Sequence, residues 1–243
     1  MVVFNLKKHF IPFIFLTFTA ILLSGCMYPG DLKTENQVPA QDQIDSVQRA
    51  ITQFQEDTGV LPIKNREQDT DLFIKYLIDF EKLVPKYLAS APANSYEKGG
   101  IFQYIIWNPE NKPTVKLVDL RVPERIRDVN LRQMTMEYPQ YKDRVSESVY
   151  TINFKNLGFE NEITVASPYS NTQLPLVLST LGDVYVDYSI DLNLFLQEHN
   201  LTPEPGEDIR FLLAEYYPVV PAYSLPYTVD DENEPIFMYN PLE

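Results

Sequence analysis

The clearest chemical candidate in the sequence is Cys26, which closes the tetrapeptide Leu23-Ser24-Gly25-Cys26. Cys26 is the only cysteine in the chain, so a disulfide within the chain, a second reactive thiol and a metal site built from cysteines are excluded. A thiol is a strong nucleophile, and the small side chains of Ser24 and Gly25 leave it unobstructed. These features make Cys26 chemically suited to covalent modification.

The segment before this cysteine has the pattern of an export signal. Two lysines precede residues 10–23, which are apolar apart from two threonines. This apolar stretch is shorter than the roughly 20 residues that a membrane-spanning helix needs, but its length is typical of the core of a signal peptide. We therefore predict that residues 1–25 are a signal peptide.

The tetrapeptide that ends at Cys26 resembles the lipobox of bacterial lipoproteins. The resemblance implies cleavage before Cys26 and attachment of a diacylglyceryl group to its sulfur, with fatty acids such as palmitate as the acyl chains. Two acyl chains are about what stable membrane attachment requires. We therefore expect a lipid-anchored protein on the extracytoplasmic face of the cell membrane, with residues 26–43 as a flexible tether. The alternatives are a plain secretory signal and an uncleaved N-terminal helix with a chance cysteine.

The chain is acidic, with 20 lysines and arginines, 34 aspartates and glutamates, and a formal net charge of −14. Nucleic acids are bound through basic side chains that neutralise phosphates, so the charge argues against a nucleic-acid partner. The same charge disfavours close contact between the folded part and an anionic lipid surface. A solvated acidic surface is the simplest explanation of the composition.

Beyond the tether, one order of elements recurs in residues 44–120, 121–188 and 189–243. Each segment has the pattern of a helix, a proline turn, a short apolar segment, a second turn and a β-hairpin. Units of this size do not bury an apolar face alone, so we expect them to stack on one another. The predicted fold class is α+β, with three tandem helix–turn–β-hairpin units packed in one body.

The first two units share a short apolar motif, which stands at residues 78–83 in the first and at residues 152–157 in the second. Phe80 and Phe154 hold equivalent places in this motif, and we predict that each is buried against the helix of its own unit. Apolar spacing and turn residues predict helices over residues 43–58, 123–136, 190–199 and 209–217. Asp42 is expected to cap the first of these helices and Ser189 the third. The expected strands span residues 101–107, 114–120, 174–179, 184–188, 225–229 and 235–239.

Residues 51–62, with the sequence ITQFQEDTGVLP, resemble the end of the long helix in the major pseudopilins of type II secretion. That family continues from its D-T-G-x-x-P motif into a turn and a small sheet. The resemblance therefore implies a pseudopilin-like fold over about residues 44–107. The chain lacks the prepilin cleavage site of that family, and the lipobox stands in place of the assembly helix, so no pilus function is implied.

Across its length the chain also resembles the YphF group of Bacillus-type lipoproteins, an uncharacterised group. This resemblance rests on the lipobox and on residues 113–117 and 221–227. Members are sometimes described as periplasmic binding components of ABC transporters. The resemblance implies an envelope lipoprotein and no established activity.

Catalytic and metal-binding chemistry finds little support in the sequence. His199 is the only histidine beyond the signal peptide, and a Ser-His-Asp triad would need it as the base. Asp183, Asp187 and Asp191 recur every four residues, and residues 230–234 form a second acidic cluster. Such clusters could bind calcium, and paired carboxylates could catalyse glycoside hydrolysis. Solvated hairpin turns explain these acidic residues more simply. We expect no cofactor and no metal.

Tyrosines beside proline-rich turns form the candidate recognition surface. Aromatic faces next to polar loops suit sugars and peptides, although such rings also fill small cores. The candidates are Tyr169, Tyr216, Tyr217, Tyr223 and Tyr227.

These features together predict a non-catalytic binding or scaffolding protein of the cell envelope, whose partner is an envelope protein, a peptide or a sugar. The first alternative is a solute-binding component of an ABC transporter, which would usually need two α/β lobes around a cleft. The second alternative is a wall-active hydrolase, which would need a pair of carboxylates in a groove.

Overall fold

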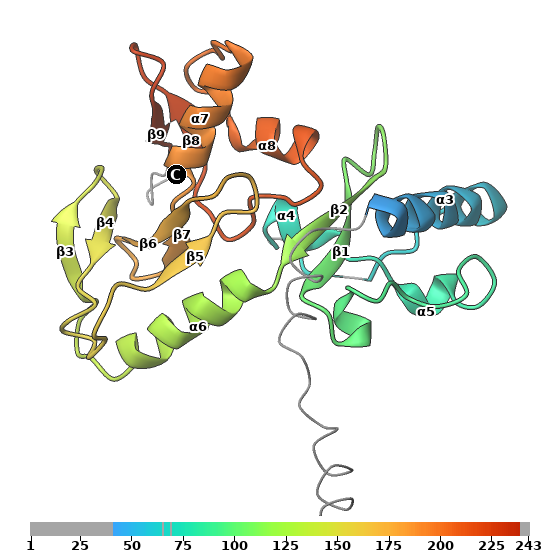
Figure 1. Cartoon of the computed structure of the whole chain (residues 1–243), viewed down its shortest axis with the longest axis horizontal. Helices are drawn as coiled ribbons and strands as arrows, with labels where there is room; N and C mark the ends of the chain where they lie inside the picture. The colour runs from blue at the N-terminus through green and yellow to red at the C-terminus, as the bar shows by residue number, and fades with distance from the viewer. Residues whose placement is uncertain (1–40, 65, 69, 239–243) are drawn as a thin grey trace, which may run out of the picture. The chain divides into compact units, whose positions relative to one another are not determined.

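The computed structural model describes residues 41–64, 66–68 and 70–238, which hold helices and small antiparallel sheets in an α+β arrangement (Figure 1). The predicted signal peptide, the lipobox with Cys26, most of the predicted tether, and Tyr239 at the end of the last predicted strand lie outside these residues. Within the described residues, no helix has the length and apolarity needed to cross a bilayer.

The first helix, α3, spans Gln41–Thr58 and ends at Gly59, which has a φ of +74°. Glycine adopts this left-handed conformation without strain, which is why it so often ends a helix. The helix begins earlier than predicted, so residues 41–43 are helical and do not belong to the tether. Asp42 lies within the first turn, where its negative charge favours the helix N-terminus without acting as a cap.

The first sheet is built on the hairpin of β1 (Phe102–Trp107) and β2 (Thr114–Asp119), which confirms the predicted strand pair. Short elements fill the connection from α3 to this hairpin: α4 (Leu72–Lys75), α5 (Phe80–Leu83) and the 3₁₀ helix η2 (Tyr96–Lys98). Single bridges extend the sheet on both sides, from Ile63 to Ile78, from Leu77 to Ile105 and, in parallel, from Leu117 to Val219.

The second sheet follows α6 (Arg121–Gln133), which carries Pro123 in its first turn as predicted. It consists of β3 (Tyr141–Arg144), β4 (Val149–Ile152), β5 (Thr164–Ala166), β6 (Gln173–Ser179) and β7 (Val184–Val186). The strands pair in the order β3-β4-β6-β5, and β7 also pairs with β6. The predicted hairpin of residues 174–179 and 184–188 is therefore the β6–β7 pair.

The two sheets have matching connections. In the first, Leu77 pairs with Ile105, which pairs with Lys116 on β2. In the second, Thr151 pairs with Val177, which pairs with Tyr185 on β7. Equivalent backbone bonds close the preceding loops: Asp79 N–H donates to Pro62 O at 2.7 Å, and Asn153 N–H donates to Gln140 O at 2.8 Å. The short apolar motif of each unit therefore begins after an equivalent backbone hydrogen bond and beside an equivalent pair of strands, although the second sheet also contains β3 and β5.

Equivalent faces of the two hairpins cover the two helices. One hydrophobic core joins α3 to the face that carries Phe102, Tyr104, Ile106, Val115 and Leu117. The other joins α6 to the face that carries Leu174, Leu176, Leu178, Val184 and Val186. Phe80 and Phe154 lie in these respective cores with exposed fractions of 5% and 7%, so the prediction that both are buried against their own helices is confirmed.

The last segment contains α7 (Ser189–His199), α8 (Arg210–Tyr216) and the hairpin of β8 (Tyr227–Val229) and β9 (Pro235–Phe237). These elements occur in the predicted order, but Ser189 lies in the first turn of α7 and makes no side-chain cap. Most of the buried apolar side chains of α7, α8 and β8 join the core of the second sheet instead of forming a separate one. Residues 218–220 join it to the first sheet, because Leu117 N–H donates to Pro218 O and Val220 N–H donates to Leu117 O.

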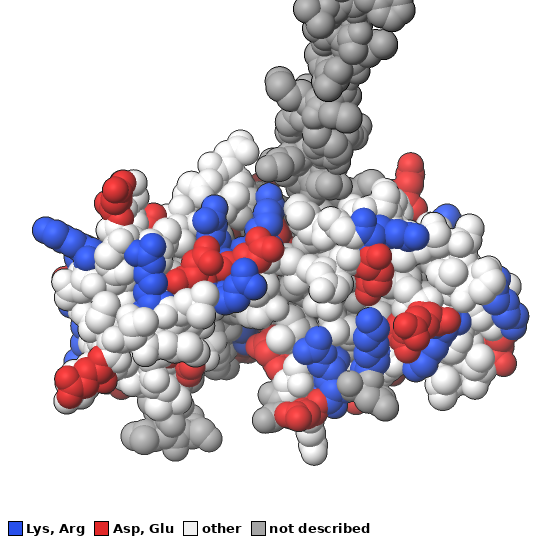
Figure 2. Space-filling view, turned by 90° about the horizontal axis from the view of Figure 1, so that it is seen from below, with Lys and Arg blue, Asp and Glu red and all other residues white. Residues whose placement is uncertain are grey.

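Charged side chains of both signs are interspersed on the face seen in Figure 2. Over the described residues the basic side chains of the ion pairs are largely exposed, apart from Arg121 and Arg210, each of which binds an aspartate two positions earlier. The net negative charge is therefore not gathered into a single acidic patch on this face, in agreement with the expected solvated surface.

Candidate ligand-binding groove

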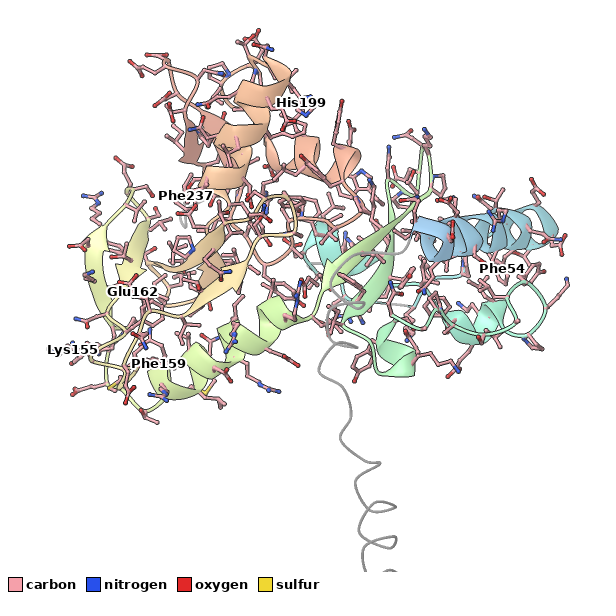
Figure 3. The ribbon with its side chains drawn as sticks, viewed as in Figure 1. Phe54, Lys155, Phe159, Glu162, His199 and Phe237 are labelled. Carbon is pink, nitrogen blue, oxygen red and sulfur yellow. The ribbon has the colours of Figure 1, made fainter. Side chains whose placement is uncertain are left out.

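Three of the five predicted tyrosines lie together around α7 and the end of α8. The ring centroid of Tyr169 is 4.9 Å from that of Tyr217, and the ring of Phe195 on α7 is 5.2 Å from Tyr216 and 5.9 Å from Tyr217. His199 lies at the end of α7 (Figure 3). Its ring packs in a tilted arrangement against Phe195 at 4.3 Å and Tyr216 at 4.5 Å. His199 is therefore a member of an aromatic cluster.

A cavity of about 430 Å³ opens beside this cluster, and we call it the aromatic groove. Its volume falls in the range of about 300–1,000 Å³ that is usual for small-ligand sites. Its walls combine aromatic and aliphatic side chains with a few polar groups. The lining residues are Tyr169, Ser170, Asp191, Leu194, Phe195, Gln197, Glu198 and Tyr217.

Asp191 fixes the loop that carries Tyr169. Its carboxylate accepts hydrogen bonds from the hydroxyls of Ser167 at 2.8 Å and Ser170 at 2.7 Å. The Ser167 hydroxyl in turn accepts from the backbone N–H groups of Tyr169 and Ser170. The Tyr169 hydroxyl donates to Val219 O at 3.1 Å, which ties the other end of the ring to the segment after α8. The groove is thus held in shape without a ligand.

The electrostatics of the groove are those of a negatively charged or neutral site. Asp191 is only 2% exposed, and burial raises the pKa of its carboxyl group above the ordinary value despite the opposing serine hydrogen bonds. Burial also raises the pKa of the Tyr169 and Tyr217 hydroxyls. Neither lysine nor arginine is among the lining residues. The groove is therefore unsuited to anions.

Of the predicted tyrosines, Tyr216 belongs to the aromatic cluster without lining the groove, and Tyr223 and Tyr227 are not lining residues either. Tyr227 is fully buried, and its hydroxyl donates to Asp187 Oδ1 at 2.8 Å while it accepts from the N–H of Tyr188 at 3.0 Å. Tyr223 is half-buried with a φ of +60° and packs against the core. Both belong to the predicted recognition surface, but the ring of Tyr227 lies in the interior and that of Tyr223 packs partly against it, because the packing of distant segments decides where each ring lies.

The acidic residues that suggested calcium have other partners. Asp187 binds Tyr227, Asp191 binds two serines, and Asp230 Oδ1 accepts from the backbone N–H groups of Glu232 and Glu234 in a hairpin turn. Within the part of the chain that the structure describes, no group of three or more His, Cys, Asp or Glu side chains is arranged to hold a metal ion.

The sequence reasoning missed the roles of Phe195, Ser167 and Ser170. A signal for the serines was present, since they flank Tyr169 in a loop that begins Ser-Pro. Their shared acceptor is more than twenty positions away at Asp191, so the arrangement depends on the tertiary fold.

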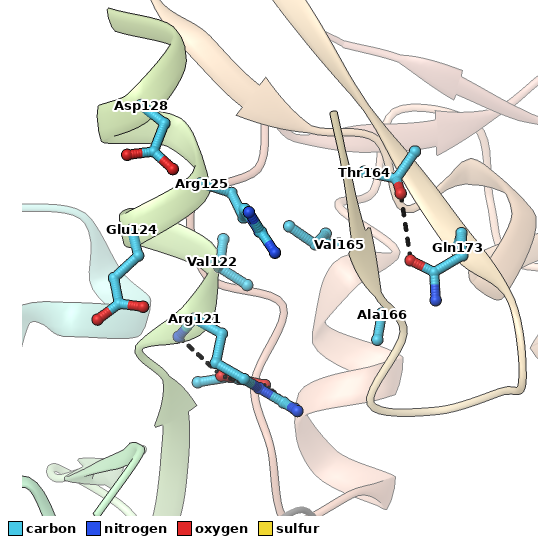
Figure 4. A pocket seen from close by; sticks show the side chains of 10 residues that line it. Arg121, Val122, Glu124, Arg125, Asp128, Thr164, Val165, Ala166 and Gln173 are labelled. Atoms are coloured by element: carbon cyan, nitrogen blue, oxygen red, sulfur yellow. Dashed lines mark hydrogen bonds and ion pairs between the residues drawn. The ribbon is translucent and has the colours of Figure 1, made fainter. Parts of the chain in front are cut away.

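A second cavity, of about 460 Å³, lies between α6 and β5 (Figure 4). Arg121 on its wall is bound by Asp119, with Nε 2.9 Å from Oδ1, and Thr164 donates to Gln173 at 3.2 Å. Arg125 points into the space, and Glu124 and Asp128 lie on the same helix. Because charges of both signs line this cavity and it contains no aromatic ring, the aromatic groove is the better candidate for ligand binding.

Replacing Asp191 should separate its charge from its hydrogen bonds. The raised pKa means that the folded state binds the proton more tightly than the unfolded state, so stability falls as pH rises above about 3.8 through the folded pKa. Asp191→Asn can still accept from one serine hydroxyl through Oδ1 and donate to the other through Nδ2. We expect it to lose less stability than the alanine variant at neutral pH and to show a weaker dependence on pH than the wild type. Urea unfolding at several pH values measures this.

The matched variant is Asp191→Ala, which leaves the hydroxyls of Ser167 and Ser170 without their acceptor. We expect this change to lower the free energy of unfolding by about 1–3 kcal/mol. Equal losses in the asparagine and alanine variants would contradict the interpretation, because they would show that the negative charge itself holds the loop.

Comparison with known proteins gives a family match in the first part of the chain. No match was found among curated proteins or among solved structures. The resemblance to pseudopilins therefore stays a prediction. The aromatic groove lies beyond the matched region, so the comparison says nothing of its ligand. Residues 40–119, from α3 to the end of β2, match the YphF family N-terminal domain, and this part of the chain is similar to that family.

Proposed function

We propose that this protein is a lipid-anchored extracytoplasmic lipoprotein that binds an uncharged oligosaccharide of the cell envelope, without catalysis, in the aromatic groove. The observation that carries the proposal is the set of ring faces from Tyr169, Phe195 and Tyr217 around a preformed cavity. Ligand sites typically combine apolar and aromatic walls with a few fixed polar groups.

The chemistry of the groove favours a sugar over the other expected partners. Sugar rings have an apolar face that packs on aromatic rings and hydroxyls that need polar partners. Ser170, Gln197 and Glu198 supply such partners at the edge of the groove. An acidic peptide is disfavoured by Asp191 and Glu198, and no basic lining residue compensates for them.

A binding experiment tests the groove directly. We expect a chito-oligosaccharide to bind the full chain in calorimetry, and Tyr217→Ala to weaken binding about tenfold, because a stacked ring contributes on the order of 1 kcal/mol beyond its buried area. Tyr138→Ala is the matched control, since Tyr138 is 69% exposed and lies outside the groove. Equal affinity in the two variants would refute the assignment of the groove.

Anchoring through Cys26 is the second part of the proposal. The support is the sequence Leu23-Ser24-Gly25-Cys26 and the absence of any other cysteine. We expect Cys26→Ser to yield a protein that stays in the aqueous phase when a detergent solution is warmed and separates, whereas the wild type enters the detergent phase. Gln37→Ser, which changes a polar residue of the proposed tether, is the control. Detergent partitioning of the Cys26 variant like that of the wild type would defeat the anchor.

We also propose that the chain arose from three tandem units, residues 44–120, 121–188 and 189–243. The support is strongest for the first two, whose hairpins bury equivalent faces against α3 and α6. The third unit contains a helix, a short helix and a hairpin in the same order as the first unit. Stacked units of this kind offer loops from several units to one partner, which suits a scaffolding role beside ligand binding.

The two alternative functions make different demands. A wall-active hydrolase would use Asp191 and Glu198, which both line the groove. Both oxygens of Asp191 are occupied by serine hydroxyls and the side chain is almost inaccessible, which favours the binding role. A solute-binding component of a transporter would usually need two α/β lobes around a cleft, whereas the described residues form small antiparallel sheets.

A further inference from the structure

A third cavity, which we call the tryptophan cleft, lies apart from the aromatic groove and has a volume of about 360 Å³. It is formed where the end of β1, the loop after it, α4 and α8 meet. Most of its walls are apolar, and its charged residues are all acidic. The lining residues are Leu72, Tyr76, Trp107, Asn108, Pro109, Glu110, Phe211 and Glu215.

The aromatic walls of the tryptophan cleft are held rigidly from behind. Trp107 stacks on the buried ring of Phe73, with centroids 5.3 Å apart and planes 15° apart. Phe211 approaches Phe73 edge-on at 6.1 Å and Trp107 at 5.5 Å. Phe73 is only 1% exposed, and the guanidinium of Arg210 lies 5.1 Å from its centroid. A ligand therefore meets a preorganised surface, which reduces the entropy lost on binding.

Two exposed carboxylates give the tryptophan cleft its charge. Glu110 follows Asn108, whose φ of +50° turns the chain after β1, and Glu215 lies on α8. Among the described residues neither carboxylate forms an ion pair or a hydrogen bond. The ammonium of Lys116 lies near Glu215 but donates to the backbone carbonyls of Glu215 at 3.0 Å and Tyr217 at 2.7 Å. The carboxylates remain available to a cation.

We infer that the tryptophan cleft binds a small organic cation through a quaternary ammonium group. The faces of tryptophan, tyrosine and phenylalanine attract cations electrostatically, and aromatic cages are a recurrent solution for quaternary ammonium ligands. The negative charges of the two carboxylates also attract a cation, and this attraction acts over a longer range. Trp107 and Phe211 thus supply ring surface and Glu110 and Glu215 supply negative charge for one chemical class of ligand, whereas the ring of Tyr76 already has the ammonium of Lys75 at 5.9 Å from its centroid.

The walls discriminate against other cations. A primary ammonium or a guanidinium keeps strong N–H donors, and burying such donors without acceptors costs free energy. A quaternary ammonium has no N–H group, so its methyl groups pack against Leu72 and Pro109 while its charge faces the rings. A neutral molecule of the same shape gains the apolar contacts but neither the cation–π attraction nor the pull of the carboxylates.

The single tryptophan of the chain makes the test direct, because all tryptophan fluorescence comes from Trp107. The full chain in a non-ionic detergent is titrated with choline and with 3,3-dimethyl-1-butanol, in which a carbon replaces the nitrogen of choline. We expect a saturable change of fluorescence with choline and at least tenfold weaker binding of the neutral analogue. Calorimetry with the same two compounds provides a second readout.

Variants distinguish the two parts of the site. We expect the double variant Glu110→Gln and Glu215→Gln to weaken choline about tenfold and to leave the neutral analogue unaffected. Phe211→Ala should weaken choline about 5- to 30-fold, in line with a cation–π contribution of about 1–2 kcal/mol. Glu124→Gln, an exposed carboxylate on α6 outside the cleft, is the matched control and should bind choline as the wild type does.

Three results would overturn the assignment. They are the absence of saturable choline binding by both methods, equal affinity for choline and its neutral analogue, and an effect of Glu124→Gln as large as that of the double variant. Choline binding should be unchanged in Tyr217→Ala, so failure here and failure of sugar binding in the aromatic groove are separate outcomes.

Discussion

Replacing Arg210 with alanine should lower the free energy of unfolding by about 3–5 kcal/mol, because it breaks a buried ion pair and leaves its partners unpaired. Arg210 is 8% exposed. Its Nε and Nη2 donate to Asp208, the closest contact being 2.7 Å, and its Nη1 donates to Ser224 O at 2.6 Å. The side chain therefore holds the start of α8 to the loop before β8.

Arg121 is the matched control. Its guanidinium donates to the carboxylate of Asp119 at the start of α6, in the same Asp-x-Arg arrangement. The Arg121 side chain is 33% exposed, compared with 10% for Arg210, so water reaches its guanidinium, but its partner Asp119 is only 5% exposed and loses this contact in the variant. The Asp119 carboxylate still accepts from the backbone N–H of Arg121, so we expect Arg121→Ala to cost about 1–3 kcal/mol, less than Arg210→Ala. Urea unfolding followed by circular dichroism compares the two, and equal losses would contradict the importance of burial.

Phe80→Ala and Phe154→Ala should each lower the free energy of unfolding by about 3–5 kcal/mol, because each leaves a cavity in a packed core. Phe80 contacts the ring of Tyr104 edge-on at 5.7 Å, and Phe154 contacts Phe159 in the same way at 5.9 Å. The two residues occupy equivalent places in the short motifs of residues 78–83 and 152–157, so we expect similar losses of stability in the two variants. Denaturant unfolding at neutral pH measures both.

Leu131→Ala is the control for these core variants, because Leu131 lies on α6 but is 56% exposed. We expect it to change stability by less than about 0.5 kcal/mol. A loss at Phe80 without a comparable loss at Phe154 would argue against the equivalence of the first two units. Losses as small as that of Leu131→Ala at both positions would contradict their burial.

Local patterns in the sequence predicted most of the elements. The spacing of Ile44, Val47, Ile51 and Phe54 predicted α3, and Thr58-Gly59 predicted its end. The hairpins of β1–β2, β6–β7 and β8–β9 lie where alternating apolar residues flank turn residues. These features were predictable because helix periodicity, strand alternation and turn chemistry act between residues that are close in sequence. The match of residues 40–119 also agrees with the YphF resemblance inferred from the sequence.

The starts of the helices were less predictable. Asp42 and Ser189 have the residue types of helix caps, yet both lie inside the first turn of their helices. A cap residue and a first-turn residue differ only in backbone conformation, and acidic or hydroxyl side chains are favourable in both places.

Only the tertiary structure decided which tyrosines face a cavity. Tyr217 and Tyr227 both stand beside prolines, but Tyr217 lines the aromatic groove whereas Tyr227 is fully buried and binds Asp187. The same holds for the acids, since Asp191 holds a loop more than twenty positions away. The sequence by itself determined the longer helices, the hairpins β1–β2, β6–β7 and β8–β9, and the sole thiol, whereas α4 and the strands β3, β4 and β5 were not predicted. The packing of distant segments decided the groove and the cleft, because the environment of a ring or a carboxylate depends on neighbours that its local sequence does not encode.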